Sequence, residues 1–259
     1  MPDPVEGDER FDRPLGRDSG ALLSSEEVRV LWDFVHGDIM SGPTRQRLKE
    51  YWGMCPRHSW AYAVVEIELW EAGAGARGGH QPFDLTVLYT DLLQTMAGRL
   101  RTGRRRGQVK ALERHGQCVI CADVRGGTPA GILVTHAGMD LQQLTSEANE
   151  MRFTADWLTE TRPMWAATVC PDCAEAHSVA AQPGTLPCRA HLLSGLAISD
   201  ASVELTRTTL MELAGRVRAL TDSMTQSGRP ATELVNASWV QAVSWFNGWD
   251  FPLTLTRSS

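Results

Sequence analysis

The six cysteines of the chain all belong to short pairs in which two residues separate two side chains that can bind a metal ion. The two-residue gap lets both side chains reach one ion from a tight turn or from the first turn of a helix. Two pairs have the form C-x-x-C and two have the form C-x-x-H. They are Cys118/Cys121 and Cys170/Cys173, and Cys55/His58 and Cys188/His191.

Tetrahedral zinc takes two such pairs for each ion. Six thiolates and two imidazoles therefore complete two four-coordinate sites with no cysteine left over, and the sequence predicts two Zn²⁺ ions. Buried free cysteines, packed as small apolar side chains, are the plainer alternative, but chance rarely leaves every cysteine in a pair. A dithiol redox role lacks the βαβ context of thioredoxin-like pairs. An iron–sulfur cluster on the four C-x-x-C cysteines is less favoured, because it would strand Cys55 and Cys188.

The spacing leaves open which pairs share an ion. Fourteen residues separate Cys173 from Cys188, which favours one site on the last two pairs and one on the first two. A crossed arrangement joins Cys118/Cys121 to Cys188/His191 and Cys55/His58 to Cys170/Cys173. A third combination gives one all-cysteine site and one site with two cysteines and two histidines.

Few other residues suggest chemistry. His177 follows Cys173 by one helical turn, and a surface or capping role is favoured over a role at the metal. His36, His80, His115 and His136 have no spaced partners. Phosphate loops, dinucleotide fingerprints, nucleophile elbows and H-E-x-x-H motifs do not occur. One basic segment could bind nucleic acid, although a solvated helix face is favoured; it contains Arg99, Arg101, Arg104, Arg105, Arg106, Lys110 and Arg114.

Hydrophobic periodicity predicts a mainly α fold, a helical bundle with irregular zinc-binding segments at helix ends. Ser24 and Glu27 have capping-box spacing at the start of one helix. Asp84 is expected to cap another, which continues into the basic segment. The clearest periodicity predicts a single helix over 140–161. Further helices are expected over 44–52, from Trp60 onward, over 200–226 and from Val235 to Phe246, and residues 132–135 could form a short strand or part of a helix. Trp239, Trp245, Trp249 and Phe251 are expected to pack in the core.

Composition sets the remaining expectations. The chain has 259 residues, 42% of them hydrophobic, and a formal net charge of −6, which argues weakly against a surface that binds nucleic acid throughout. No apolar run reaches the roughly 18 residues of a membrane-spanning helix, and the acidic start lacks a signal sequence, so a cytoplasmic protein without membrane contact is expected. The expected divisions are a disordered tail (1–20), a helical module (21–72), a Gly/Ala-rich linker (73–83), a zinc-binding core (84–227) and a Trp-rich end (228–259).

The arrangement of motifs resembles an uncharacterised bacterial family of helical proteins with repeated C-P-x-C … C-x-x-H-L modules. The matching residues are Cys55-Pro56-Arg57-His58, Cys118 with Cys121, and Cys188 to Leu192. In that family each C-P-x-C pair precedes its C-x-x-H pair, but here Ala21 to Ser25 stand where the first C-P-x-C would be. Cys170 and Cys173 look like an extra pair. The resemblance covers about residues 22–195, favours the crossed arrangement and implies no known activity.

The leading functional hypothesis is a non-catalytic zinc protein that holds an interaction or regulatory surface in shape for an unknown protein partner. A second hypothesis is a metal-dependent enzyme with one open site, with Glu175, Asp172 or His177 as the base. A third is a nucleic-acid-binding regulator that uses the basic segment 99–114.

Overall fold

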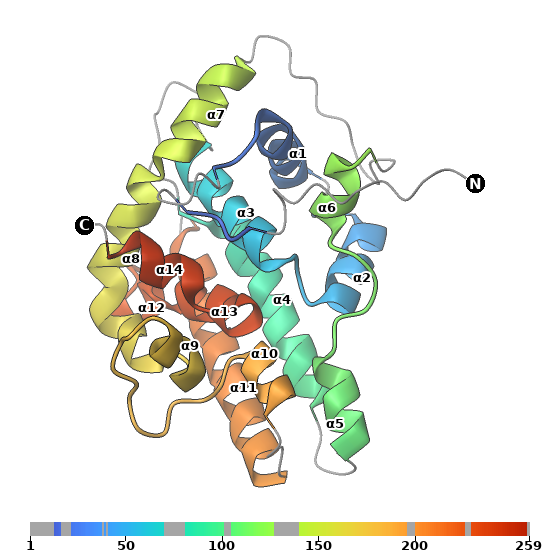
Figure 1. The fold of residues 1–259 in the computed structure, drawn as a ribbon, viewed down its shortest axis with the longest axis vertical. Coiled ribbons are helices and arrows are strands. Elements are labelled where there is room, and N and C mark those ends of the chain that lie inside the picture. The colour runs from blue at the N-terminus through green and yellow to red at the C-terminus, as the bar shows by residue number, and fades with distance from the viewer. Residues whose placement is uncertain are drawn as a thin grey trace.

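The structure, a computed structural model, confirms the mainly α class (Figure 1). It describes residues 13–16, 22–37, 39, 41–69, 81–100, 105–126, 140–195, 200–225 and 229–257, which contain no strand. The helices are α1 (Ser25–Val35), α2 (Gly42–Tyr51), α3 (Pro56–Leu69), α4 (Phe83–Arg99), α5 (Arg105–Leu112), α6 (Val119–Val124), α7 (Leu141–Glu150), α8 (Arg152–Trp165), the 3₁₀ turn η3 (Ala166–Thr168), α9 (Pro171–Ala176), α10 (Arg189–Ser194), α11 (Asp200–Ser223), α12 (Glu233–Asn236), α13 (Ser238–Asn247) and α14 (Asp250–Leu255).

The two longest helices, α4 and α11, make the most extensive helix–helix contact, and α13 packs against both. Their buried apolar side chains recur at the three- and four-residue intervals of one helix face. On α4 these include Leu85, Leu88, Leu92 and Met96, and on α11 Leu210, Leu213, Val217 and Leu220. Burial of such stripes, worth about 1.5–3 kcal/mol for each large side chain, stabilises the long pair.

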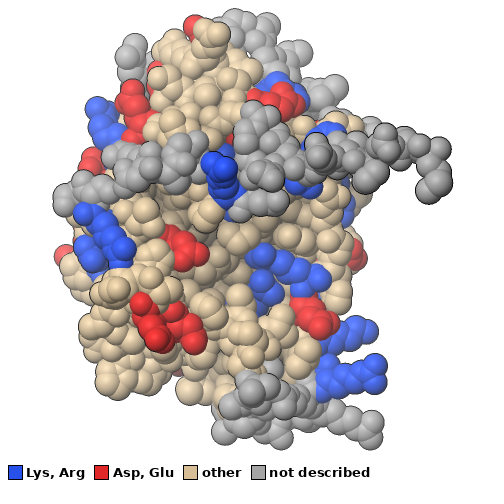
Figure 2. Space-filling view, in the orientation of Figure 1, with Lys and Arg blue, Asp and Glu red and all other residues tan. Residues whose placement is uncertain are grey.

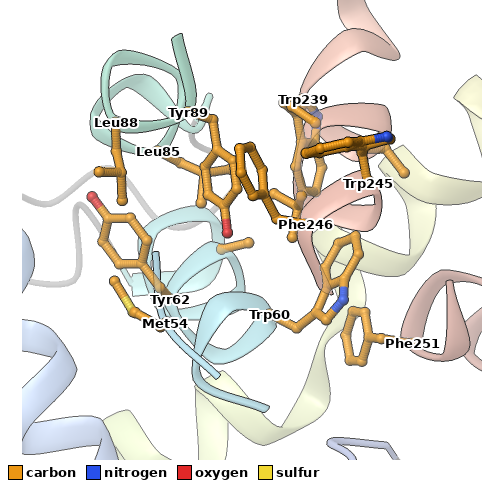
Figure 3. Packing of buried hydrophobic residues seen from close by; sticks show 14 of the residues in the cluster. Met54, Trp60, Tyr62, Leu85, Leu88, Tyr89, Trp239, Trp245, Phe246 and Phe251 are labelled. Atoms are coloured by element: carbon orange, nitrogen blue, oxygen red, sulfur yellow. The ribbon is translucent and has the colours of Figure 1, made fainter. Parts of the chain in front are cut away.

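Helix α3 lies at the centre of the fold, where it contacts α1, α4, α7, α8 and α13. Every residue from Arg57 to Leu69 is buried, so this helix has no solvent-facing side. Figure 3 shows Trp60 of α3 between the aromatic rings of α13 and α14. Its ring is stacked on Phe251 at 4.9 Å and meets Trp239 edge-on at 6.0 Å. The predicted core role of the C-terminal aromatic residues is confirmed, since Trp239, Trp245, Trp249 and Phe251 are all buried.

Two buried glutamates of α3 set the start of other helices. Glu66 accepts the backbone N–H groups of Asp84 (2.6 Å) and Leu85 (3.0 Å) at the beginning of α4. The prediction that Asp84 caps this helix is therefore wrong: α4 begins at Phe83, and the Glu66 carboxylate satisfies the N–H groups that a cap would bind. Burial, with the nearby charge of Asp84, raises the pKa of Glu66 well above its ordinary value.

Glu68 acts in the same way on α8. It accepts the backbone N–H of Thr154 at 2.8 Å and that of Phe153 at 3.4 Å. The single helix predicted over 140–161 is consequently two helices, which meet at Met151 in the left-handed conformation (φ 49°). The hydrophobic repeat continues across this break because Met151 is itself buried. The side chain of Asp140 caps α7 by accepting hydrogen bonds from the N–H groups of Gln142 and Gln143.

Other boundaries also differ from the predictions. The helix from Phe83 ends at Arg99, and the basic residues that follow belong in part to a separate helix, α5. Gly42 and Pro43, expected to precede α2, form its first turn, where proline's missing N–H costs nothing. The last predicted helix is divided into α12 and α13, and the expected aromatic tail forms α14. The capping box of Ser24 and Glu27 is confirmed.

Within the ranges that the structure describes, no helix is long and apolar enough to cross a membrane. The buried residues of all described segments form one hydrophobic cluster. The predicted tail (1–20) is described only at residues 13–16, where Leu15 is buried, and the Gly/Ala-rich linker (73–83) only at 81–83. Residues 132–135, His80 and His136 lie outside the described residues.

Candidate metal centres

The four ligand pairs share one local structure. In each, the first cysteine directly precedes a helix and the second ligand lies in its first turn. The carbonyl of the first cysteine accepts the N–H four residues later, as in Ala122 to Cys118 (3.1 Å) and Leu192 to Cys188 (2.8 Å). This turn brings two side chains three residues apart onto one side of the helix end. The helix that begins after Cys118 and contains Cys121 is α6.

The first centre joins the start of α3 to the start of α6. It consists of Cys55, His58, Cys118 and Cys121, whose donor atoms all lie within 4.8 Å of one another. Nδ1 of His58 is 3.3 Å from the sulfur of Cys55, 3.7 Å from that of Cys118 and 3.2 Å from that of Cys121. The sulfurs of Cys55 and Cys121 are 3.8 Å apart.

These distances fit a tetrahedral ion. Bonds of about 2.3 Å to sulfur and 2.0–2.1 Å to nitrogen place sulfur and nitrogen roughly 3.6 Å apart, and two sulfurs roughly 3.8 Å apart. The four side chains therefore already stand at the separations that one bound zinc ion requires.

A buried ion-pair network holds the imidazole of the first centre. Nε2 of His58 lies 3.2 Å from Oε1 of Glu27, which belongs to α1. Arg57 binds both oxygens of the same carboxylate, at 2.6 and 3.0 Å, and donates to the carbonyl of Leu22 at 2.8 Å. Glu27, Arg57 and His58 are each at most 4% exposed. With Nε2 engaged, Nδ1 is the nitrogen that faces the sulfurs.

The charges of this network favour a cation between the thiols and the carboxylate. Burial alone would raise the pKa of Glu27, but hydrogen bonds from His58, Arg57 and the Ser24 backbone outweigh it and lower the pKa to about 2. Burial would likewise lower the pKa of His58, yet the sulfurs of Cys118 and Cys121 and the Glu27 carboxylate raise it to about 11. The space between Nδ1 of His58 and the sulfurs therefore favours a positive charge, which either a proton on Nδ1 or a metal ion can supply.

The second centre joins α9 to α10. Its donors are Cys170, Cys173, Cys188 and His191, again within 4.8 Å of one another. Nδ1 of His191 lies 3.2, 3.5 and 3.3 Å from the three sulfurs in that order. The backbone N–H of Trp249 donates to the Cys173 sulfur, so the start of α14 also contacts this centre.

The two centres differ in how the histidine is held. The His58 side chain is fully buried, whereas the His191 side chain is 36% exposed. The acidic group nearest to His191 is Asp172, at 4.0 Å from Nδ1 and itself 60% exposed. Within the described residues, the second centre therefore has three buried thiols but no buried carboxylate like the one that orients the first.

The C-x-x-C helices of the two centres are the same motif. Both α6 and α9 have six residues, and both end with a residue in the left-handed conformation eight positions after the first cysteine. That residue is Gly126 (φ 84°) after α6 and Ser178 (φ 54°) after α9. After α9 the N–H groups of Ser178 and Val179 bind the carbonyls of Glu175 and Ala174, which is the Schellman pattern.

All eight sequence-predicted ligands lie in these two groups, arranged as the short spacing favoured. The crossed arrangement, which the family resemblance favoured, does not occur. The four C-x-x-C cysteines are divided between the groups, so they do not meet around one iron–sulfur cluster. His177 is separate from the donors: it forms the C-cap of α9, with Nε2 2.7 Å from Asp250.

Sequence reasoning missed the residues that support the donors. The capping-box spacing predicts Glu27 only as part of a helix cap, and no local pattern indicates its contact with a histidine 31 residues away. Arg189, inside the Cys188/His191 pair, is buried and donates to the carbonyls of Phe246 (3.2 Å) and Leu112 (2.6 Å). The signal in the sequence was an arginine between the two ligands of a C-x-x-H pair, as Arg57 is in the first pair and Arg189 in the last.

Part of the basic segment has a structural role. Arg114 donates to Asn247 at 2.6 Å and to the carbonyl of Met54 at 3.1 Å, and Arg99 lies over the ring of Trp52. Arg106 and Lys110 are exposed, while Arg101, Arg104 and the Arg105 side chain lie outside the described part of the chain. Figure 2 shows basic and acidic side chains interspersed on the visible face.

No protein-family model, curated protein or solved structure matches this chain.

Proposed function

We propose that the chain binds two structural zinc ions, each through three cysteines and one histidine, and that it serves as a non-catalytic interaction or regulatory scaffold. One observation carries the proposal. Two separate groups of four donors stand at separations that fit a tetrahedral ion, and together they use every cysteine in the chain. Thiolate-rich tetrahedral sets with an imidazole are typical of structural zinc.

The position of the centres supports a crosslinking role. The first ties α3 to α6, more than fifty residues later, and Glu27 extends this link to α1. The second ties α9 to α10 and contacts Trp249. The helices α6, α9 and α10 have six residues each, too few to be stable alone, so a bound ion would contribute to folding.

Four protein donors at each centre argue against the enzyme hypothesis. A hydrolytic zinc ion keeps one position for water or substrate beside a general base. Among the candidate bases, His177 is engaged with Asp250, and Asp172 lies at the edge of the second centre. The nucleic-acid hypothesis gains no support from Arg99 and Arg114, because both side chains contact neighbouring parts of the protein.

Cobalt substitution tests the coordination directly. A chain loaded with two Co²⁺ ions should give the intense visible bands of closed tetrahedral thiolate sites. Cys121→Ser should lose the contribution of the first centre, and Cys173→Ser that of the second. A weak five- or six-coordinate spectrum that changes on adding small anions would indicate an open site and would contradict the structural role.

A further inference from the structure

A pocket of about 300 Å³ lies between α11, α13, η3 and the loop that joins α9 to α10. Figure 1 shows this loop extending beside the lower half of the molecule, where α11 runs. The volume is at the lower end of the range of about 300–1,000 Å³ that is usual for small-molecule sites. Its walls are mainly apolar, with Leu186, Leu205, Leu210, Leu213, Trp245 and Trp249 among them.

The polar groups of the wall are mostly satisfied within the protein. The hydroxyls of Thr168, Thr185 and Thr209 donate to backbone carbonyls at 2.7–3.0 Å. The Gln241 amide donates to the carbonyl of Met164 at 3.4 Å and accepts from Nη2 of Arg216 at 3.2 Å. None of these groups requires a ligand.

Arg216 is different. It is the only charged residue of the wall, and no carboxylate pairs with it within the described ranges. Its Nη1 makes no hydrogen bond there, and its buried Nε has no partner. Nε1 of Trp245, a side chain only 7% exposed, also lacks an acceptor. The unmatched atoms at the pocket are thus all donors, and one carries a positive charge.

The geometry points to a binding site for a small apolar carboxylate. The carboxylate would bind the Arg216 guanidinium, and the hydrocarbon part would lie against Leu205, Leu210 and Leu213. A carboxylate supplies only acceptors and one negative charge, which is the complement of what the wall leaves unmatched. Nε of Arg216 and Nε1 of Trp245 are both covered from solvent, so the carboxylate would bind Nη1 of Arg216. None of the wall residues is a metal ligand, although the backbone of Trp249 also contacts the second centre.

The test is calorimetric titration of the purified full chain with octanoate, octan-1-ol and octylamine at fixed ionic strength. Octanoate should bind at least about tenfold more tightly than octanol, and octylamine most weakly, because the charge-assisted bond to Arg216 selects the anion. Tryptophan fluorescence should change with octanoate, since Trp245 and Trp249 line the pocket.

Matched variants locate the site. Arg216→Gln should weaken octanoate binding about tenfold or more, while Arg218→Gln, at an exposed position of the same helix, should not. Leu205→Glu adds a negative charge at the pocket and should also weaken binding, whereas Met211→Glu, exposed but not in the wall, should not. All four variants should melt like the parent chain.

Two results would overturn the proposal. One is equal affinity for octanoate and octanol together with no effect of Arg216→Gln, which would identify a neutral apolar site. The other is no binding of octanoate at about 1 mM, a concentration at which even weak sites begin to fill.

Discussion

Nε2 of His58 lies 3.2 Å from a carboxylate oxygen of Glu27, while Nδ1 of the same ring faces three cysteine sulfurs. A carboxylate bound to the far nitrogen of a metal-binding histidine fixes the ring's orientation and increases its basicity. Glu27 is also the third residue of α1 and completes its capping box. One side chain therefore connects the start of the N-terminal helix to the first candidate metal centre.

Replacing this carboxylate should weaken metal binding at the first centre. Glu27→Gln keeps the length and the capping geometry of the side chain but removes the charge that His58 and Arg57 share. We expect zinc affinity at that centre to fall about 10- to 100-fold, as is usual for partners of metal-binding histidines. Competition with a coloured chelator would measure it. Glu26→Gln is the matched control, because Glu26 is exposed and contacts only Arg29. Equal zinc affinity of the first centre in Glu27→Gln and Glu26→Gln would show that Glu27 has no role at the metal.

Acidification should release the two ions in a defined order. The pKa of Glu27 is about 2 in the folded chain against an ordinary 4.5, so its stabilising contribution is complete above about pH 4.5 and is lost only as the pH falls toward 2. Glu27 thus still orients His58 while protons displace metal from the thiolates. Among the described residues, the exposed His191 has no such buried partner, so the second centre should lose its ion at the higher pH.

Glu27→Gln should shift the release from the first centre upward, by roughly 0.3–0.5 pH unit for each tenfold loss of affinity if two to three protons replace the ion. The measurement is zinc released against pH in the Cys121→Ser and Cys173→Ser backgrounds, which isolate one centre each. If the first centre released its zinc at a higher pH than the second, the account would be contradicted.

The ends of the two C-x-x-C helices predict a stabilising substitution. Ser178 occupies the left-handed position after α9 that glycine, as Gly126, occupies after α6. The left-handed conformation costs a non-glycine residue about 1–2 kcal/mol. Glycine avoids this cost, but its greater conformational freedom stabilises the unfolded chain and offsets part of the benefit. Ser178→Gly should therefore raise the free energy of unfolding by about 0.5–1 kcal/mol, measured by denaturant titration. Gly126→Ser, the reciprocal change, should lower it by a similar amount. A loss of stability in Ser178→Gly together with a gain in Gly126→Ser would rule out the common motif.

Glu68 provides a test of the break between α7 and α8. Glu68→Ala would leave the buried N–H of Thr154 without its acceptor, which should cost about 1–3 kcal/mol of folding free energy. Glu160→Ala, at an exposed position of α8, is the control and should change stability by less than about 0.5 kcal/mol. Similar stabilities of the two variants would mean that Glu68 does not set the start of α8.

Local signals in the sequence predicted much of the fold. The capping box at Ser24 and the helix expected over 200–226 depend on neighbouring residues, and both were confirmed. The break at Met151 and the start of α4 depend on Glu68 and Glu66, which lie in another helix. No periodicity of α7, α8 or α4 contains that information.

The candidate sites divide in the same way. Ligand spacing within each pair is local, so all eight donors were named from the sequence. The partner of each pair, the carboxylate of Glu27 and the pocket at Arg216 depend on how distant helices pack. The spacing between Cys173 and Cys188 indicated one grouping, while the family resemblance indicated another, and only the three-dimensional arrangement distinguishes them.

Metal content per chain, with thiol reactivity measured on the same sample, tests the central claim most directly. On protein purified without a tag or added metal, we expect two zinc ions per chain and six cysteines that react only after a chelator is added. Iron in place of zinc, less than one metal ion per chain, or cysteines that react at once would contradict two closed structural zinc centres.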